Sequence, residues 1–388
     1  MRRTVAITAA MIVAAIAPAA IAAKGGGPKV SVVASALNSP KQLLYTKHGL
    51  LVAESGVGGP VGASSCITGP STGGSGTTQY CQGNSGAVDV IHGTKVSVAA
   101  GALPSVVEED NNEAAGPAAV TRTPNGGLAV LFQDELVSKG GGNAFSGATA
   151  KQFGTLQLPG GRSVDLARFA AQHPQSAAKL GGTPGETAYD SDPYDLVAYH
   201  GGYAVTDAAA NSLLSVSAGG KVTLLARFPT QAEQVPAGAL GPTAMTIHAQ
   251  AVPTSVAVGP DGALYVGLLR GVPSAPGTAQ IYRVVPGHAP TVWARGLTSV
   301  TAIAFDHQGR LLATELSTGG LLAPSTVPGA LVRISAGGRH ATKLAVPGLF
   351  DPSGVAVAPN GTVYVSNDGT SPKTATPPGE VLKITGLG

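Results

Sequence analysis

Apolar and polar residues alternate in short segments that come in pairs, and a glycine-containing turn joins the two members of each pair. The clearest pair is VPTSVAVGPDGALYVG, which begins at Val252, and DPSGVAVAPNGTVYVS, which begins at Asp351, repeats it closely. Four further versions begin at Pro40, Pro117, Asp192 and Ser299. Alternation with a period of two predicts strands, and Asp-Gly or Asn-Gly turns predict tight hairpins. The sequence therefore predicts six β-hairpins.

A third strand follows each hairpin after a connection of variable length. These third strands begin at Gly86, Phe153, Asn211, Ala279, Gly329 and Gly379. A fourth strand usually follows, as at Lys221 and Pro290. Units of four strands that recur about every 45 to 77 residues are typical of propeller blades. We therefore predict an all-β fold, a six-bladed β-propeller.

The two ends of the chain each hold an incomplete unit. The last unit has no fourth strand after the segment at Gly379, and the strand KVSVVAS, which begins at Lys29, has no hairpin before it. We predict that this N-terminal strand pairs with the last blade and closes the ring, so that no free edge remains. Residues 23–388 would then form a single propeller domain.

Residues 1–22 have the features of a signal peptide. Arg2 and Arg3 precede an apolar run from Val5 to Ala17, and Ala20 to Ala22 form an A-x-A cleavage site. A membrane anchor is the alternative, but the run is short and Pro18 ends it. We predict a secreted bacterial protein that has no membrane span after cleavage of this peptide.

The charge balance bears on the kind of partner. The chain has 24 Lys and Arg against 21 Asp and Glu, and cleavage would remove Arg2 and Arg3, which leaves 22 minus 21, or +1. Such a weak net charge argues against nucleic acid or an anionic membrane surface as partner. The 55 glycines and 29 prolines are consistent with many turns, and the 43% hydrophobic content excludes simple disorder.

The chain has two cysteines, Cys66 and Cys81, which lie 15 residues apart in a segment rich in Gly, Ser and Thr. In an exported protein such a pair most simply forms a disulfide that holds one long loop, and loop-closure entropy would make it worth about 3 kcal/mol. A zinc site is less well supported, because no other cysteine and no matching histidine pattern accompanies the pair.

Long insertions fall between the second and third strands of the predicted blades, at residues 55–85, 134–152, 268–278, 316–328 and 368–378. In a propeller these connections share one face with the loops that lead into each blade. The opposite face would consist of tight hairpin turns with little room for a pocket. We therefore expect a monomer that contacts a small molecule or a protein through its loop-rich face.

Oxygen-bearing side chains gather at the ends of the second strands on that face. They are Glu54, Asp207, Glu315 and Asn367, with Asp134 and Asp368 nearby and with Asn38, Asp192 and Asp351 in the loops before the first strands. Such residues are the ligands that a hard cation prefers, so one hypothesis is a site for Ca²⁺ or another divalent cation. The alternative is that these side chains accept hydrogen bonds from backbone amides and cap the loops. No other cofactor is indicated.

No residue is assigned a catalytic role from the sequence. Five histidines, His48, His92, His200, His288 and His307, lie in or beside strand turns, where a general base has no shielded position. His248 lies between blades and is expected to be a solvated loop residue. Trp293 should pack between blades, and Ser163–His173 should contain a short helix that ends before Pro174.

Several motifs resemble those of the ScyD/ScyE family of exported β-propeller proteins. They are GPSTGGSGTTQYC ending at Cys81, DPYDL from Asp192, AVPTSVAVGPDGALYVG from Ala251, AQIYRVVPG from Ala279 and DPSGVAVAPNGTVYVSN from Asp351. The resemblance covers about residues 37–384 and implies the propeller fold and export, but no defined reaction. This chain has Leu268, Ala118 and Ala119 where members often have more polar residues, which weakens a polar channel site. NHL-repeat and gluconolactonase-type six-bladed propellers are more distantly similar.

Two functional hypotheses follow. The first is a secreted binding or scaffolding module that uses the loop-rich face, including the Cys66–Cys81 loop. The second is a metal-assisted hydrolase or lyase of the lactonase kind, in which the cation would polarise a carbonyl group and activate water. The fold alone does not choose between them.

Overall fold

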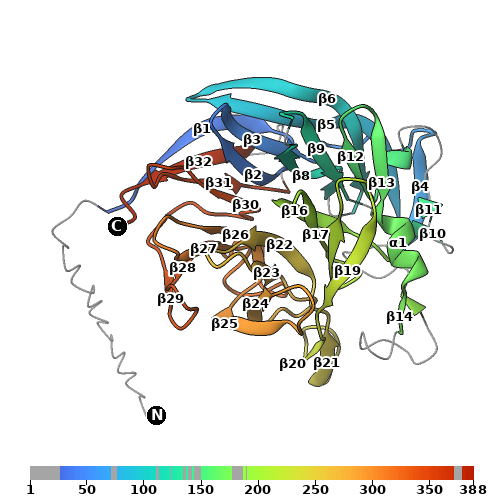
Figure 1. Ribbon diagram of the computed structural model, residues 1–388. Coiled ribbons are helices and arrows are strands. Elements are labelled where there is room, and N and C mark those ends of the chain that lie inside the picture. The colour runs from blue at the N-terminus through green and yellow to red at the C-terminus, as the bar shows by residue number, and fades with distance from the viewer. Residues whose placement is uncertain are drawn as a thin grey trace, which may run out of the picture.

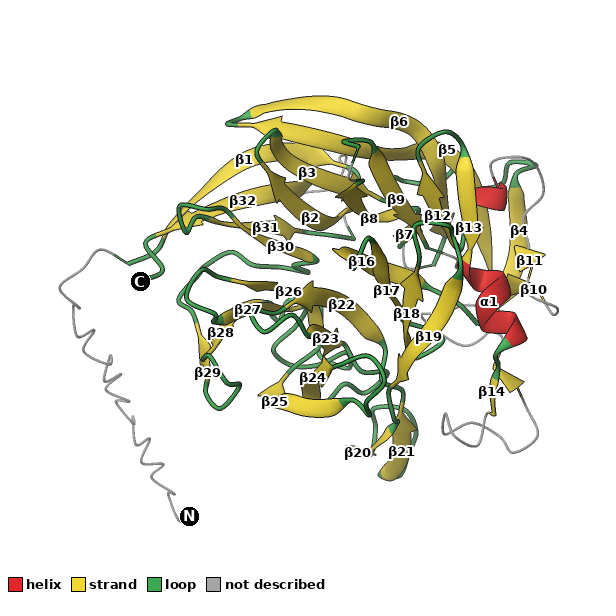
Figure 2. Ribbon diagram, in the orientation of Figure 1, coloured by secondary structure: helices red, strands yellow, loops and turns green. Residues whose placement is uncertain are grey.

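The computed structural model describes residues 27–70, 77–110, 113–123, 125–133, 137–138, 142–143, 150–176, 187–188, 190–370 and 378–388. The predicted signal peptide, residues 1–22, lies outside the described residues. In the described part, six sheets are arranged radially and follow one another in chain order around a ring (Figures 1 and 2). The prediction of a six-bladed propeller is confirmed.

Each blade has four strands that run from the axis outward in antiparallel order. Blade 1 contains β2 (Pro40–Thr46), β3 (Gly49–Glu54), β5 (Thr77–His92) and β6 (Lys95–Glu108), and blade 2 contains β8 (Pro117–Arg122), β9 (Leu128–Phe132), β12 (Thr155–Leu158) and β13 (Arg162–Asp165). Blade 3 contains β16 (Pro193–Tyr199), β17 (Gly202–Asp207), β18 (Ser212–Val216) and β19 (Val222–Arg227), and blade 4 contains β22 (Pro253–Val258), β23 (Leu264–Leu268), β24 (Ala279–Val284) and β25 (Thr291–Leu297). Blade 5 contains β26 (Val300–Phe305), β27 (Leu311–Glu315), β28 (Ala330–Ile334) and β29 (Ala341–Lys343), and blade 6 contains β30 (Gly354–Val357), β31 (Val363–Asn367), β32 (Gly379–Thr385) and β1 (Lys29–Leu37).

Smaller elements decorate this frame. Blade 1 gains β4 (Cys66–Pro70) and β7 (Ala114–Ala115), and three short ladders stand apart from the blades: β10 (Val137–Ser138) with β11 (Gly142–Asn143), β14 (Gln175–Ser176) with β15 (Thr187–Ala188), and β20 (Gln231–Val235) with β21 (Met245–Ala249). In the described part of the chain the helices are η1 (Ala150–Gln152) and α1 (Leu166–Gln172). The Asp165 side chain caps α1 by accepting a hydrogen bond from the Arg168 amide, 2.8 Å away. The predicted short helix is therefore confirmed.

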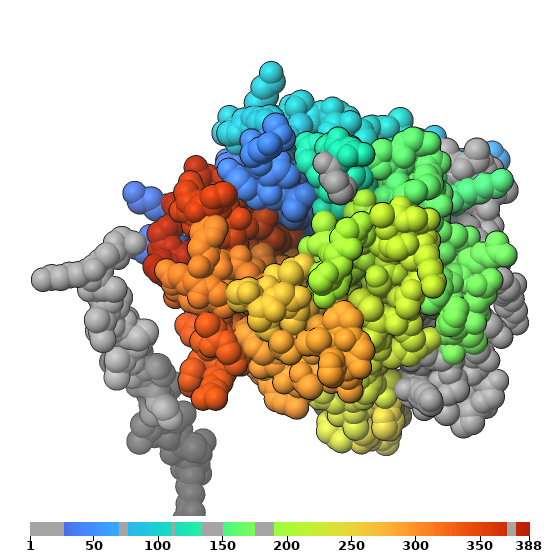
Figure 3. All heavy atoms as spheres, viewed as in Figure 1, coloured from blue at the N-terminus to red at the C-terminus, as the bar shows by residue number. Residues whose placement is uncertain are grey.

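The N-terminal strand closes the ring. Strand β1 pairs antiparallel with β32, from Lys29 opposite Thr385 to Leu37 opposite Gly379. In the space-filling view the first residues of the described chain (blue) lie against the C-terminal blade (red) (Figure 3). Pairing the two ends of the chain in one sheet satisfies the backbone groups that an unclosed last blade would leave exposed. The predicted closure is confirmed.

Hydroxyl groups at the start of three first strands join neighbouring blades. Each donates a hydrogen bond to a backbone carbonyl at the start of the next blade: Thr254 to Val300, Thr301 to Pro352, and Ser353 to Pro40. The last bond, of 2.6 Å, links blade 6 to blade 1. Buried hydrogen bonds in equivalent positions fix the angle between successive blades.

Replacing Ser353 with alanine is expected to lower the free energy of unfolding by about 1.5 kcal/mol, because the buried Pro40 carbonyl would lose its donor. The measurement is chemical denaturation followed by circular dichroism. Ser31, an exposed residue in β1 of the same blade, provides the control, and Ser31→Ala should change the value by less than about 0.5 kcal/mol. Equal effects of the two substitutions would contradict a role of the hydroxyl in closure.

A side chain of blade 1 reaches across the central axis of the propeller. Gln42, in β2, is 6% exposed, and its Nε2 donates to the carbonyls of Thr254 in blade 4 and Thr301 in blade 5, at 3.3 and 3.1 Å. One amide group thus ties blade 1 to two blades on the far side of the ring. At this level a polar side chain therefore reaches across the centre of the propeller.

Apolar side chains fill the spaces between blades. The largest cluster lies between blades 4 and 5, where Trp293 packs edge-on against Tyr265 and contacts Phe305. Tyr265 also packs against Phe305, with the ring centroids 4.9 Å apart. Aromatic rings in these arrangements add specific stabilisation to the burial of their area. The prediction that Trp293 packs between blades is confirmed.

Candidate functional site: the elaborated face

The direction of the strands sorts the connections onto two faces. The turns between first and second strands form one face, called here the turn face (residues 47–48, 123–127, 200–201, 259–263, 306–310 and 358–362). The described parts of the connections between second and third strands, together with residues 173–176, 187–188, 190–192 and 228–252 between blades, form the elaborated face. The long connections between second and third strands were predicted from the sequence, whereas the hairpin of β20 and β21 was not.

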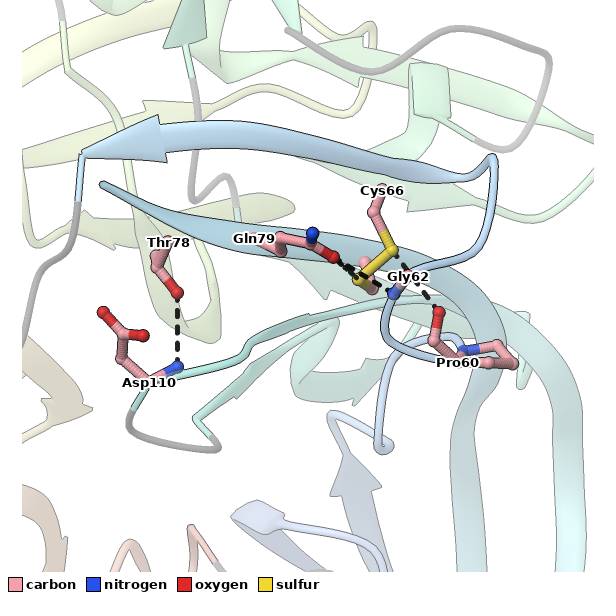
Figure 4. Close-up of a disulfide and its surroundings, with 7 residues drawn as sticks. Pro60, Gly62, Cys66, Thr78, Gln79 and Asp110 are labelled. Carbon is pink, nitrogen blue, oxygen red and sulfur yellow. Dashed lines mark hydrogen bonds between the residues drawn. A yellow bond between two sulfur atoms is a disulfide. The ribbon is translucent and has the colours of Figure 1, made fainter.

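The disulfide holds a three-stranded extension of blade 1 on the elaborated face. Cys66 in β4 and Cys81 in β5 are joined, and they lie directly opposite each other in the strand register. Around it, the Gln79 side chain accepts a hydrogen bond from the Gly62 amide at 3.0 Å, and the Thr78 hydroxyl accepts one from the Asp110 amide (Figure 4). The predicted disulfide is confirmed, and it pins two strands together rather than a structureless loop.

The extension rests on blade 2. Tyr80, in β5, is completely buried and belongs to an apolar cluster with Val106, Ala150 and Phe153. The last two residues come from the connection between the second and third strands of blade 2. Blade 1 therefore reaches over its neighbour, and the two blades form a continuous part of the elaborated face.

The four residues of the cation hypothesis lie at the ends of second strands in blades 1, 3, 5 and 6. Each accepts a hydrogen bond from a backbone amide in the loop that leads into its own blade: Glu54 from Asn38 at 2.6 Å, Asp207 from Asp192 at 2.8 Å, Glu315 from Thr298 at 2.8 Å, and Asn367 from Phe350 at 2.9 Å. The recurrence in four blades indicates a common structural role, which is to fix the start of the blade.

Asp207 has two further partners. Its carboxylate also accepts hydrogen bonds from the Ser191 hydroxyl at 2.7 Å and the Ala210 amide at 3.0 Å. Burial raises the pKa of Asp207 and that of Glu315 above the ordinary range. Among the residues that the structure describes, no group of three or more His, Cys, Asp or Glu side chains is arranged to hold a metal ion.

A separate acidic group lies at the rim of blade 6. The Asn367 amide donates to both Asp368 at 2.9 Å and Glu380 at 3.1 Å. Burial, together with the nearby charges of Glu380 and Asp351, raises the pKa of Asp368 to about 7. A cation at this rim would relieve the repulsion between these carboxylates.

A buried polar network anchors the β20–β21 hairpin to blade 4. Arg270 is 1% exposed and donates hydrogen bonds to the Pro229 carbonyl at 3.2 Å and to Gln231 at 2.7 Å. Glu233, also buried, accepts a hydrogen bond from the Ala275 amide at 2.9 Å. Neither residue was predicted from the sequence, because a charged residue in a connection is expected to face solvent. The only sequence signal was that the insertion carries charge next to an otherwise apolar strand.

A buried carboxyl group joins blades 3 and 4 near the axis. Asp195, in β16, is 8% exposed and accepts hydrogen bonds from the amides of Leu196 and Val256, both at 2.8 Å. Burial raises the pKa of Asp195 to about 7, although the two amide donors act in the opposite direction. The alternating pattern of the strand did not distinguish this residue from a solvent-facing one.

The outcome for the other candidates is mixed. His248 is exposed in β21, in agreement with the prediction of a solvated residue, although it belongs to a strand and not a loop. The turn face was expected to have little room for a pocket, but cavities of about 280 and 320 Å³ lie there, lined by hairpin turns of neighbouring blades.

Among the described residues, no helix has the length and apolar character needed to cross a membrane. No protein-family model and no curated protein matches the sequence.

Solved structures with a similar fold include virginiamycin B lyase from Staphylococcus aureus, which is 13% identical with a TM-score of 0.46, over 92% of this chain and 99% of that one. A glucose dehydrogenase is 15% identical with a TM-score of 0.49, over 92% and 99% of the two chains. A gluconolactonase from Xanthomonas campestris is 10% identical with a TM-score of 0.46, over 94% and 92%. At these identities the similarity concerns the fold alone.

Proposed function

We propose that this protein is an exported propeller of the ScyD/ScyE type that acts as a binding or scaffolding module through its elaborated face. The motifs at Asp192, Ala251 and Asp351 support the family resemblance. The disulfide is compatible with an oxidising, extracellular compartment, which supports export.

The main support for the proposal is that covalent and buried contacts hold the two extensions of the elaborated face rigidly in place. The Cys66–Cys81 bond and the cluster around Tyr80 fix the extension of blade 1, and Arg270 and Glu233 fix the base of the β20–β21 hairpin. Beyond that base, Leu240 is 49% exposed. A rigid surface loses little conformational entropy on binding, which favours recognition of a partner.

The binding role is tested by site-specific photo-crosslinking in the cells that produce the protein. A photoreactive amino acid at Leu240 is expected to give a discrete crosslinked species. The same group at Asn360, an exposed residue of the turn face, should give none. Crosslinking from Asn360 alone, or from neither site, would contradict a module that works through the elaborated face.

The alternative function is a metal-assisted lactonase-like hydrolase or lyase at the channel mouth, with Glu54, Asp207, Glu315 and Asn367 as ligands of Ca²⁺ or another divalent cation. The feature that favours it is the acidic rim of blade 6, where burial and, beyond it, the charges of Glu380 and Asp351 raise the pKa of Asp368. For this role the four strand-end side chains would have to exchange amide partners for the cation.

Metal analysis separates the two functions. Under the binding proposal, protein purified without chelator should contain less than about 0.1 equivalents of divalent metal by mass spectrometry, and EDTA should shift the melting temperature by less than about 1 °C. One equivalent of metal, lost together with several degrees of melting temperature and absent from Asp207→Asn, would favour the hydrolase instead. Asp165→Asn, which removes a carboxylate from the end of blade 2, is the matched control.

A further inference from the structure

Lys41, the second residue of β2, is buried near the axis at the start of blade 1. Only 2% of its surface is exposed. Its ammonium group makes no hydrogen bond and no ion pair with any of the described residues. Buried lysines are nearly always paired, because a charge away from water is costly without a partner. Lys41 therefore lacks the counter-charge that would offset its burial.

The strand position of Lys41 explains why it has no partner. In blades 4, 5 and 6 the equivalent residues carry hydroxyl groups that donate to a backbone carbonyl at the start of the next blade: Thr254, Thr301 and Ser353. The equivalent acceptor for Lys41 would be the carbonyl of Pro117 in blade 2. That carbonyl accepts a hydrogen bond from the Ser55 hydroxyl instead, at 3.2 Å. The interblade contact made elsewhere by a hydroxyl is thus already satisfied, and the ammonium is left over.

The ammonium keeps contact with solvent. Lys41 Nζ is not among the unpaired buried atoms that are sealed from solvent in the described residues, so the small exposed area of Lys41 includes its nitrogen. On one flank blade 6 covers the residue, where the Lys41 carbonyl accepts a hydrogen bond from the Ser366 hydroxyl at 2.6 Å. Lys41 precedes Gln42, whose side chain crosses the axis, so it lies on the elaborated side of that crossing. Solvent therefore reaches the ammonium through a narrow opening at the elaborated end of the central channel.

We propose that the elaborated end of the central channel binds a small monovalent anion, a carboxylate or a halide, at Lys41. The ammonium presents N–H donors and a full positive charge, and with little water around it the attraction exceeds that of an exposed lysine. The anion has to be small, because so little of Lys41 can be reached. The proposal goes beyond the binding module, which uses the extensions of the elaborated face, and its ligand has the opposite charge to the cation of the alternative function.

The probe is formate, and binding is measured by saturation-transfer NMR of the formate proton with the full-length mature protein in a buffer free of other small anions. Formate is expected to bind with a dissociation constant on the order of 10 mM. Pivalate, which has the same charge and a bulkier body, should bind at least about 10-fold more weakly, because it does not fit the opening. Displacement of formate by chloride would identify a general anion site and a lack of displacement a carboxylate site, and both results agree with the proposal.

Substitutions locate the site. Lys41→Met keeps the length of the side chain without the charge, and it should weaken formate binding at least about 10-fold. This variant should fold, because it removes an unpaired charge from a buried position. The control is Lys95→Met, which removes an exposed charge at the start of β6 in the same blade and should leave formate binding unchanged.

Two results with the wild-type protein would overturn the proposal whatever the variants do. One is undetectable formate binding at 100 mM (about 10 times the expected dissociation constant), and the other is equal binding of formate and pivalate. Equal formate binding by the wild type and Lys41→Met would overturn it as well. Photo-crosslinking at Leu240 does not depend on any of these outcomes, so failure of the anion site and failure of the binding module can be told apart.

Discussion

Replacing Gly58 with alanine is expected to lower the free energy of unfolding by about 4 kcal/mol, from backbone strain and steric overlap together. Gly58 has a φ of 61°, and a Cβ atom there would lie 2.4 Å from the Val107 amide nitrogen and 2.6 Å from the Cys81 carbonyl oxygen. Both contacts are with backbone, which cannot turn away. The extension of blade 1 would have to separate from the segment beneath it.

The matched control is Gly62→Ala, four residues further along the same segment. Gly62 also has a positive φ, 79°, but its missing Cβ would have no atom within 4 Å. This substitution should cost only the strain, about 1 kcal/mol. Thermal and urea denaturation of the two variants measure the difference. Equal destabilisation by the two substitutions would show that the segment is not packed against β5 and β6 as described.

Raising the pH from about 4 to about 7 is expected to lower the free energy of unfolding by about 3 kcal/mol through Asp195 alone. The folded protein holds the Asp195 proton with a pKa of about 7, whereas the unfolded chain releases it near the ordinary value for aspartate. Between these two values the folded state binds more protons than the unfolded state, so stability falls as the pH rises. Denaturation at a series of pH values measures this slope.

Asp195→Asn should remove most of this slope, because an amide does not titrate in the window. Asp261→Asn is the control. Arg283, at 2.7 Å, holds the pKa of Asp261 below the ordinary range, so the stabilisation from this ion pair is lost only as the pH falls below about 4. The slope between pH 4 and 7 should therefore persist in Asp261→Asn. If it also persisted in Asp195→Asn, another buried acid, such as Asp368, would be responsible.

The propeller could be predicted because its signals are local and repeated. Alternating strands and glycine turns fix each hairpin, and six copies of one pattern leave few arrangements other than a ring. The same reasoning placed β1 in the last blade, since both ends were incomplete. The β20–β21 hairpin was missed because its strands are short and flanked by segments rich in Pro and Gly, which a sequence pattern does not separate from a loop.

The candidate site was less predictable, because side-chain partners depend on the positions of loops. The sequence placed Glu54, Asp207, Glu315 and Asn367 correctly at the ends of second strands, and it left open whether metal or backbone amides would satisfy them. The amides that they contact lie 15 to 17 residues earlier in the chain. The cavities of the turn face depend on how neighbouring blades meet, which no local pattern specifies.

The pairing of β1 with β32 also has a consequence for biogenesis. Residues 29–37 leave the ribosome long before residues 379–385, so the sheet that joins them cannot assemble until the later segment has emerged. The earlier segment must stay unpaired while more than 300 residues are synthesised. The ring can therefore close only after nearly all of the propeller has been made.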